Sequence, residues 1–99
     1  MYTCFCCGFK TLTEQPPGSF EICPVCFWED DPAQAANPSL AGGANKVSLS
    51  EARQNFLSFG ASSRDVLNSV RRLLPAEVNA DATLFRSTRQ DGSYQDPTN

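Results

Sequence analysis

Four cysteines near the start of the chain constrain its fold more than any other feature. They form two C-x-x-C pairs, Cys4 with Cys7 and Cys23 with Cys26, and fifteen residues separate the pairs. Two residues between ligands allow a tight turn to direct both sulfurs at one ion, and the separation of the pairs is typical of tetrahedral metal sites. The 99-residue chain contains no histidine, so the sequence predicts an all-sulfur site.

Zinc is the metal we expect at these four cysteines, although iron also accepts four thiolates in tetrahedral geometry. Residues 20–26 are similar to the second metal-binding turn of rubredoxins, which makes a rubredoxin-like iron electron carrier the alternative. Phe27 stands where such turns usually have glycine, and the gap between the pairs is shorter than in rubredoxins. One structural Zn²⁺ per chain is therefore expected, because four protein ligands leave no open position for catalysis.

Cys6 is the fifth cysteine, and its side chain should point away from the ion held by its neighbours. It is either a small buried apolar residue or a reactive thiol. An odd number of cysteines and the lack of an apolar leader predict a reducing, cytoplasmic location. A thiol redox enzyme using one C-x-x-C pair stays an alternative, but the chain lacks the βαβ pattern in which such pairs usually occur.

The formal net charge of −3 is concentrated in the N-terminal third, where Lys10 is the one basic residue among residues 1–31. A negative surface repels phosphate backbones, so the charge disfavours nucleic-acid binding. Nucleic-acid binding stays an alternative that would depend on four arginines of the C-terminal half, Arg53, Arg64, Arg71 and Arg72. We expect these arginines on solvated helix faces. No apolar run is long enough to span a membrane.

Alternation of apolar residues predicts strands at 9–12 and 19–22, joined through a turn at Pro16-Pro17-Gly18. In the second strand Phe20 and Ile22 would share the buried face. The two cysteine pairs would then flank one hairpin. Residues 32–47 are rich in Pro, Ala, Gly and Asn and are interpreted as an irregular loop.

Two helices are expected after this loop. Ser48 and Glu51 have capping-box spacing and begin the first helix, which Gly60 ends. The second would start at Ser62 or Ser63 and end at Pro75. The apolar stripe of the second helix consists of Val66, Leu67, Val70, Leu73 and Leu74.

The expected class is α+β: a small zinc-ribbon β-hairpin with two zinc knuckles, packed against two C-terminal α-helices. This domain would cover residues 1–74, and residues 75–99 would form a polar C-terminal tail. Leu84 and Phe85 are the one apolar pair in the tail, and they are candidates for docking on the domain or on a partner.

An acidic aromatic segment follows the second cysteine pair: Trp28, Glu29, Asp30 and Asp31. One interpretation buries the tryptophan and solvates the acids. A second makes the segment a partner-binding surface, with an aromatic anchor ringed by negative charge. A third uses the clustered carboxylates to bind a hard cation.

Several motifs together resemble the cysteine-rich CPCC family of small bacterial proteins. The matching segments are Cys4-Phe5-Cys6-Cys7-Gly8, residues 16–31, residues 42–49, Glu51-Ala52-Arg53 and Phe59-Gly60-Ala61. They extend over roughly residues 1–74, and Phe5 departs from the proline that the family name implies. The resemblance implies a zinc-ribbon-like domain but no reaction.

The function that the sequence favours is a non-catalytic, zinc-binding protein-interaction module. The chain has no histidine to act as a general base, and its acidic half suits a protein partner. An immunity protein that neutralises a bacterial toxin is one form of this hypothesis, drawn from the size and charge of such proteins.

Overall fold

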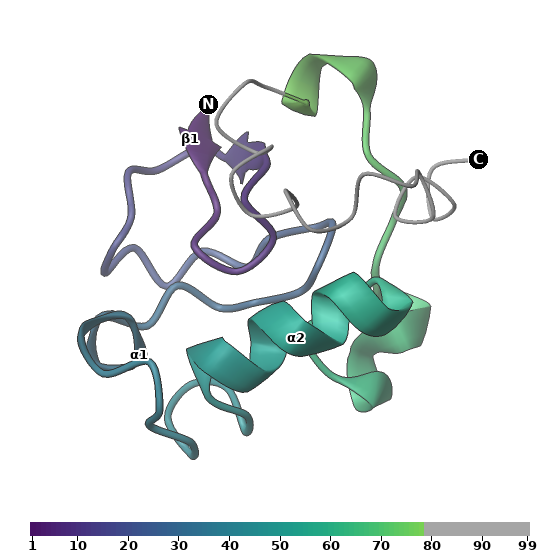
Figure 1. Cartoon of the computed structure of the whole chain (residues 1–99). Coiled ribbons are helices and arrows are strands. Elements are labelled where there is room, and N and C mark those ends of the chain that lie inside the picture. Colours follow the sequence, from purple (N-terminus) through teal and green to yellow (C-terminus); the bar gives the residue numbers. More distant parts are fainter. Residues whose placement is uncertain (79–99) are drawn as a thin grey trace.

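The computed structural model describes residues 1–78 of the chain. The elements in chain order are β1 (Tyr2–Thr3), β2 (Lys10–Leu12), α1 (Pro32–Ala36), α2 (Leu49–Phe59) and two 3-10 helices, η1 (Arg64–Ser69) and η2 (Pro75–Glu77) (Figure 1). This arrangement confirms the α+β class. The boundary expected at residue 74 stays a prediction, and Leu84 and Phe85 lie outside the described residues.

The hairpin forms around the first cysteine pair rather than between the two pairs. β2 falls within the strand predicted at 9–12, but it pairs antiparallel with β1, which places Tyr2 opposite Leu12. The turn between the two strands contains the first cysteine pair, Cys4 and Cys7, together with Cys6. The amide of Cys4 donates to the carbonyl of Phe9 at 2.9 Å, so the cysteine turn itself brings the strands together.

The strand predicted at 19–22 is wrong. Phe20 has a left-handed φ of 57° and is 51% exposed, and Ile22 is 43% exposed. Ile22 forms an isolated antiparallel bridge with Glu29, across the second cysteine turn. Each cysteine turn therefore pairs the two backbone segments on its own sides. The segments between the two turns already have these partners and do not pair with each other as a hairpin.

The helix α2 is the one predicted between Ser48 and Gly60, and both of its ends are confirmed. The hydroxyl of Ser48 accepts the amide of Glu51 at 3.1 Å, and Gly60 ends the helix with a φ of 89° that glycine adopts without steric penalty. The buried residues of the helix are Leu49, Ala52 and Phe56. The ring of Phe56 packs edge-on against Phe9, with centroids 6.2 Å apart, and this contact joins α2 to the cysteine turns.

The second α-helix, predicted up to Pro75, is wrong: η1 is a short 3-10 helix, and the backbone is extended from residue 70. Two hydrogen bonds to the second cysteine turn explain the difference. The amide of Ser62 donates to the carbonyl of Cys26 at 2.8 Å, and the amide of Arg71 to that of Pro24 at 3.0 Å. A straight α-helix would separate those amides by about 13–14 Å, too far to serve carbonyls of one tight turn.

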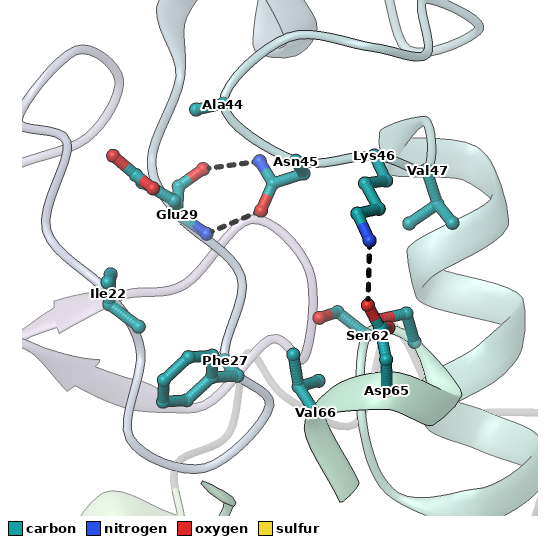
Figure 2. Close-up of a pocket in the computed structure, with 11 residues that line it drawn as sticks. Ile22, Phe27, Glu29, Ala44, Asn45, Lys46, Val47, Ser62, Asp65 and Val66 are labelled. Atoms are coloured by element: carbon teal, nitrogen blue, oxygen red, sulfur yellow. Dashed lines mark hydrogen bonds and ion pairs between the residues drawn. The ribbon is translucent and has the colours of Figure 1, made fainter.

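The segment 32–47, expected as an irregular loop, contains α1 and a buried polar network. Gln34 is fully buried, and its amide nitrogen lies within 2.9–3.1 Å of the carbonyl oxygens of Leu40, Asn45 and Val47, which share its two hydrogens. Asn45 in turn bonds both the amide and the carbonyl of Glu29 at 2.8 Å (Figure 2). These contacts fix the loop against the second cysteine turn.

Candidate metal centre

The four cysteines of the two C-x-x-C pairs converge on one point in the core. Their sulfurs all lie within 4.8 Å of one another, and the residues are at most 2% exposed. The sulfurs of Cys4 and Cys26 are 3.6 Å apart, and those of Cys7 and Cys23 are 3.8 Å apart. A tetrahedron with metal–sulfur bonds of about 2.3 Å has edges of about 3.8 Å. The spacing therefore fits one tetrahedrally bound metal ion.

The two cysteine turns have the same backbone geometry. The amide of Gly8 donates to the carbonyl of Cys4 at 2.9 Å, and the amide of Phe27 donates to that of Cys23 at 2.8 Å. Both donors have left-handed backbones, with φ of 81° for Gly8 and 68° for Phe27. Glycine adopts this conformation freely, whereas phenylalanine does so at a cost of about 1–2 kcal/mol. The fold therefore maintains a strained residue next to the second pair.

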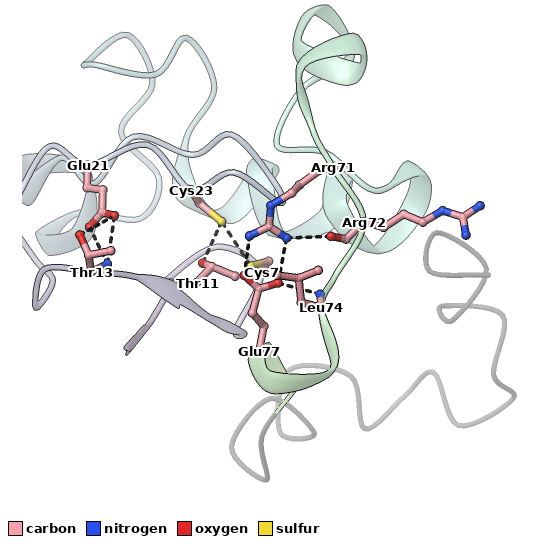
Figure 3. Close-up of polar contacts among 9 residues, drawn as sticks. All are labelled: Cys7, Thr11, Thr13, Glu21, Cys23, Arg71, Arg72, Leu74 and Glu77. Carbon is pink, nitrogen blue, oxygen red and sulfur yellow. Dashed lines mark hydrogen bonds and ion pairs between the residues drawn. The ribbon is translucent and has the colours of Figure 1, made fainter.

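Two groups outside the cluster donate hydrogen bonds to its sulfurs. The amide of Cys6 lies 3.4 Å from the sulfur of Cys4. Figure 3 shows the second contact, in which the hydroxyl of Thr11 lies 3.0 Å from the sulfur of Cys23. Hydrogen bonds to a thiolate stabilise its charged form. Thr11 is the last but one residue of β2, so the hairpin positions this hydroxyl against the cluster.

The protonation of the cluster also favours a bound cation. Burial raises the pKa of Cys7 and of Cys26 well above the ordinary value of 9.0. Burial also raises the pKa of Cys23, but hydrogen bonds from the other three cysteines and from Thr11 outweigh this effect and lower it well below 9.0. Four thiolates cannot lie side by side in a core without a compensating positive charge. A divalent metal ion supplies that charge, and its binding releases the protons.

Substituting Thr11→Val is expected to weaken metal binding by about 10–100-fold, the usual effect of losing a hydrogen bond to a ligand. The two side chains have nearly the same shape, so the 2% exposed position keeps its packing. Competition with a coloured chelator measures the affinity. Thr13→Val, on the exposed residue two positions later, is the matched control and should leave the affinity unchanged. Equal affinities for all three proteins would contradict the assigned role of Thr11.

An ion pair between Arg71 and Glu77 lies beside the cluster (Figure 3). The guanidinium donates to both carboxylate oxygens of Glu77, and its distance to Oε1 is 3.0 Å. The amide of Leu74 also donates to Oε1, at 2.8 Å. The Glu77 side chain is only 7% exposed. Hydrogen bonding to Arg71 lowers the pKa of Glu77 below its ordinary value of 4.5. This pair fastens η2 to the extended segment that follows η1.

Replacing Glu77 by glutamine should therefore destabilise the metal-loaded protein by about 1–2 kcal/mol at pH 7. The pKa of Glu77 in the folded protein lies below its ordinary value of 4.5, so the carboxylate stabilises the fold fully at pH values above 4.5. This stabilisation is lost as the pH falls through the pKa of Glu77 in the folded protein. Urea unfolding of both proteins at several pH values measures the difference. A difference that grows toward acid would contradict the assignment. Glu14→Gln, on an exposed residue outside the helices, is the control.

Cys6 lies in the same turn as the first pair but outside the group of four converging sulfurs. It is 2% exposed and belongs to the core, and burial raises its pKa above 9.0. Both observations support the interpretation of Cys6 as a buried apolar residue. The guanidine Nε of Arg53 on α2 donates to the carbonyl of the preceding Phe5 at 2.7 Å, which holds the helix against this turn.

The acidic aromatic segment does not form the exposed surface that one interpretation of the sequence required. Trp28 and Asp30 are 2% exposed and Asp31 is 7% exposed, while Glu29 is half-buried. An aromatic anchor must be accessible to its partner, and Trp28 is covered in this structure, so its burial does not support that role. Partner binding through residues 28–31 stays a prediction. The indole instead belongs to the core that packs around the cysteines.

The carboxylates of this segment are used within the fold. Asp30 accepts both the amide and the hydroxyl of Ser19, at 2.9 and 2.7 Å. Asp31 caps α1 and also accepts the amide of Ala44 at 2.8 Å, and these backbone hydrogen bonds lower its pKa. Within residues 1–78, the four cysteines are the one group of potential ligands close enough to hold an ion. The structure thus gives no support to a hard-cation site at the carboxylates.

Sequence reasoning missed three residues that organise the site. The sequence pattern places Thr11 in a strand and places Gln34 and Asn45 in a loop, and it assigns none of them a role at the site. No periodic pattern indicates any of them, because each acts through a partner distant in the chain. The motif G-G-A-N around Asn45 was a usable signal, since a short polar side chain after two glycines often bonds to backbone groups.

The fold and the site define a small α+β domain built around a buried four-cysteine metal-binding cluster. The chain belongs to the cysteine-rich CPCC family, whose model matches residues 2–77, and this match confirms the resemblance found in the motifs. No curated protein matches the chain. Across residues 1–78, every helix is too short or too polar to cross a membrane.

Proposed function

We propose that this chain is a non-catalytic zinc-binding module that binds another protein. The observation that carries the proposal is the burial of the whole cluster, in which no ligand residue is more than 2% exposed. A zinc ion bound by four sulfurs has no open position for a substrate, so its role is to hold the fold. The chain also has no histidine to act as a general base.

The proposed metal is zinc, and iron on the same four sulfurs is the alternative. The support for zinc is the phenylalanine at position 27, where iron-binding turns of this kind usually have glycine, and the short gap between the pairs. Elemental analysis and visible absorption of the purified protein decide between them. We expect a colourless protein with one zinc per chain; a red protein with one iron would establish the electron-carrier alternative instead.

Exposed apolar side chains support the protein-binding part of the proposal. Phe20 and Ile22 are 51% and 43% exposed, and they lie on the segment that leads into the second cysteine turn. The backbone there is held in place, since the amide of Phe20 donates to the carbonyl of Asp30 at 3.0 Å. Rigid exposed apolar groups are typical of protein interfaces. The net charge of −3 favours a basic partner, and a toxin neutralised by an immunity protein is one such partner.

A photo-crosslinking residue placed at Phe20 in the full, zinc-loaded chain tests this binding in the source cells. The same probe at Gln54, which is exposed on α2, is the control. We expect one protein to be crosslinked from Phe20 and not from Gln54, and to form a defined complex when both proteins are purified. If neither position yields a protein that binds the purified chain, the interaction role is wrong.

A further inference from the structure

A small pocket of about 200 Å³ opens between the second cysteine turn, the Asn45 loop and η1 (Figure 2). Ile22 and Phe27 come from the cysteine turn, Lys46 from the loop, and Ser62 and Val66 from the segment around η1. Drug-sized ligands occupy pockets of about 300–1,000 Å³, so this volume suits one side chain rather than a whole cofactor.

The wall formed by Phe27 is the first sign that the pocket is built for binding. Phe27 has the left-handed φ of 68° that Gly8 adopts at the equivalent place in the first turn. The first turn shows that the geometry needs no side chain there. Strain of this kind persists where the rest of the structure enforces it, and it often marks a functional site. The half-buried ring faces the pocket together with Ile22 and Val66 (Figure 2).

The second sign is the hydroxyl of Ser62. The residue is only 4% exposed, and within residues 1–78 its hydroxyl has no hydrogen-bond partner, although its amide and carbonyl both have one. Figure 2 shows the oxygen directed into the pocket, on the side of Phe27. A buried hydroxyl without a partner is costly, and a backbone carbonyl of a partner segment bound over the pocket would accept its hydrogen bond.

Charge at the rim selects the kind of partner. Lys46 and Asp65 form an exposed ion pair across one end of the pocket, with 3.4 Å between the charged atoms. At the other end, the carboxylate of Glu29 makes no hydrogen bond or ion pair among the described residues, because Asn45 bonds only the backbone of Glu29. Among the residues that line the pocket, Glu29 and Asp65 are opposed by Lys46 alone, so the pocket has one uncompensated negative charge.

We propose that this pocket receives one aliphatic side chain from a partner protein, with a basic residue of the partner beside Glu29 and a backbone group on Ser62. The inference rests on the proposed protein-binding function and names the site and the chemistry of the partner. The exposed side chain of Ile22 extends the apolar wall to the outside, so a partner segment would cross it on entering.

The test is an NMR titration of the metal-loaded, full-length chain with three short peptides. Acetyl-Arg-Leu-Arg-amide carries both features, acetyl-Arg-Ser-Arg-amide lacks the aliphatic side chain, and acetyl-Glu-Leu-Glu-amide reverses the charge. We expect only the first to shift the amide signals of Ile22, Lys46, Ser62 and Val66 in a saturable way. Phe27→Gly and Val66→Asp should each weaken that binding about tenfold or more, a loss of at least one hot-spot contact. Leu74→Ala, on an exposed apolar residue outside the pocket, should have no effect.

Metal content verifies that each variant keeps its fold, and Phe27→Gly should keep it because glycine relieves the left-handed strain. Shifts confined to other surfaces, or equal binding of the acidic peptide, would overturn the proposal. Contacts from Leu84 or Phe85 to the pocket in the free chain would also overturn it, since the occupant would then be the chain itself. If a crosslinked partner still binds the Phe27→Gly variant, the proposed pocket is wrong, but the protein-binding function still holds. If the basic peptide binds the pocket but no partner is crosslinked, the pocket is supported and the proposed function is wrong.

Discussion

Chelating the metal is expected to unfold the domain, with loss of dispersed amide signals and of helical circular dichroism. Five of the twelve residues of the buried core are cysteines, so little apolar core is left to hold the chain without the ion. Structural zinc sites contribute about 10–16 kcal/mol, and a domain of this size has a net stability of about 5–15 kcal/mol. Adding zinc back should restore both signals. A metal-free chain with a native spectrum would show that the cluster is not what stabilises the fold.

Two serine substitutions in the first cysteine turn provide a matched comparison. Cys4→Ser removes one of the four converging sulfurs, and the chain should then be isolated without its full complement of metal and largely unfolded. Cys6→Ser changes the same residue type in the same turn, at an equally buried position outside the cluster. It should retain one metal per chain and lose only about 1–2 kcal/mol, the cost of a small polar change in a core.

Trp28→Ala is expected to destabilise the metal-loaded protein by about 3–5 kcal/mol, because it removes a large buried side chain next to the cysteines. Phe20→Ala is the matched control: this aromatic residue lies in the same half of the chain but is 51% exposed, so its loss should change stability by no more than about 0.5 kcal/mol. Urea unfolding at a fixed free metal concentration measures both. Small and equal effects would mean that the indole is not part of the core.

The features predicted correctly from the sequence depend on neighbours in the chain. The two cysteine turns follow from a two-residue spacing, and α2 follows from the cap at Ser48 and the glycine at position 60. The prediction of a second α-helix was wrong because hydrogen bonds from Ser62 and Arg71 to the second cysteine turn override the helical pattern of apolar residues. Such bonds join residues more than thirty positions apart, and no local pattern indicates them.

The burial of the acidic segment could not be predicted from the sequence for a related reason. Asp30 and Asp31 looked like solvated charges, because their partners are backbone amides in distant loops, at Ser19 and Ala44. Once those loops are in place, the carboxylates are structural and the indole between them and the cysteines is covered. The candidate partner surface therefore moves from Trp28 to Phe27 and its pocket, one residue along the chain but on an accessible face.

We infer that one metal ion, held by Cys4, Cys7, Cys23 and Cys26, organises this fold. X-ray absorption at the metal edge of the native protein tests it most directly, because it reports the element, the ligand type and the bond length together. We expect one zinc per chain with four sulfur neighbours at about 2.3 Å and no oxygen or nitrogen ligand. A metal with mixed sulfur and oxygen neighbours, or a folded chain that contains no metal, would contradict it.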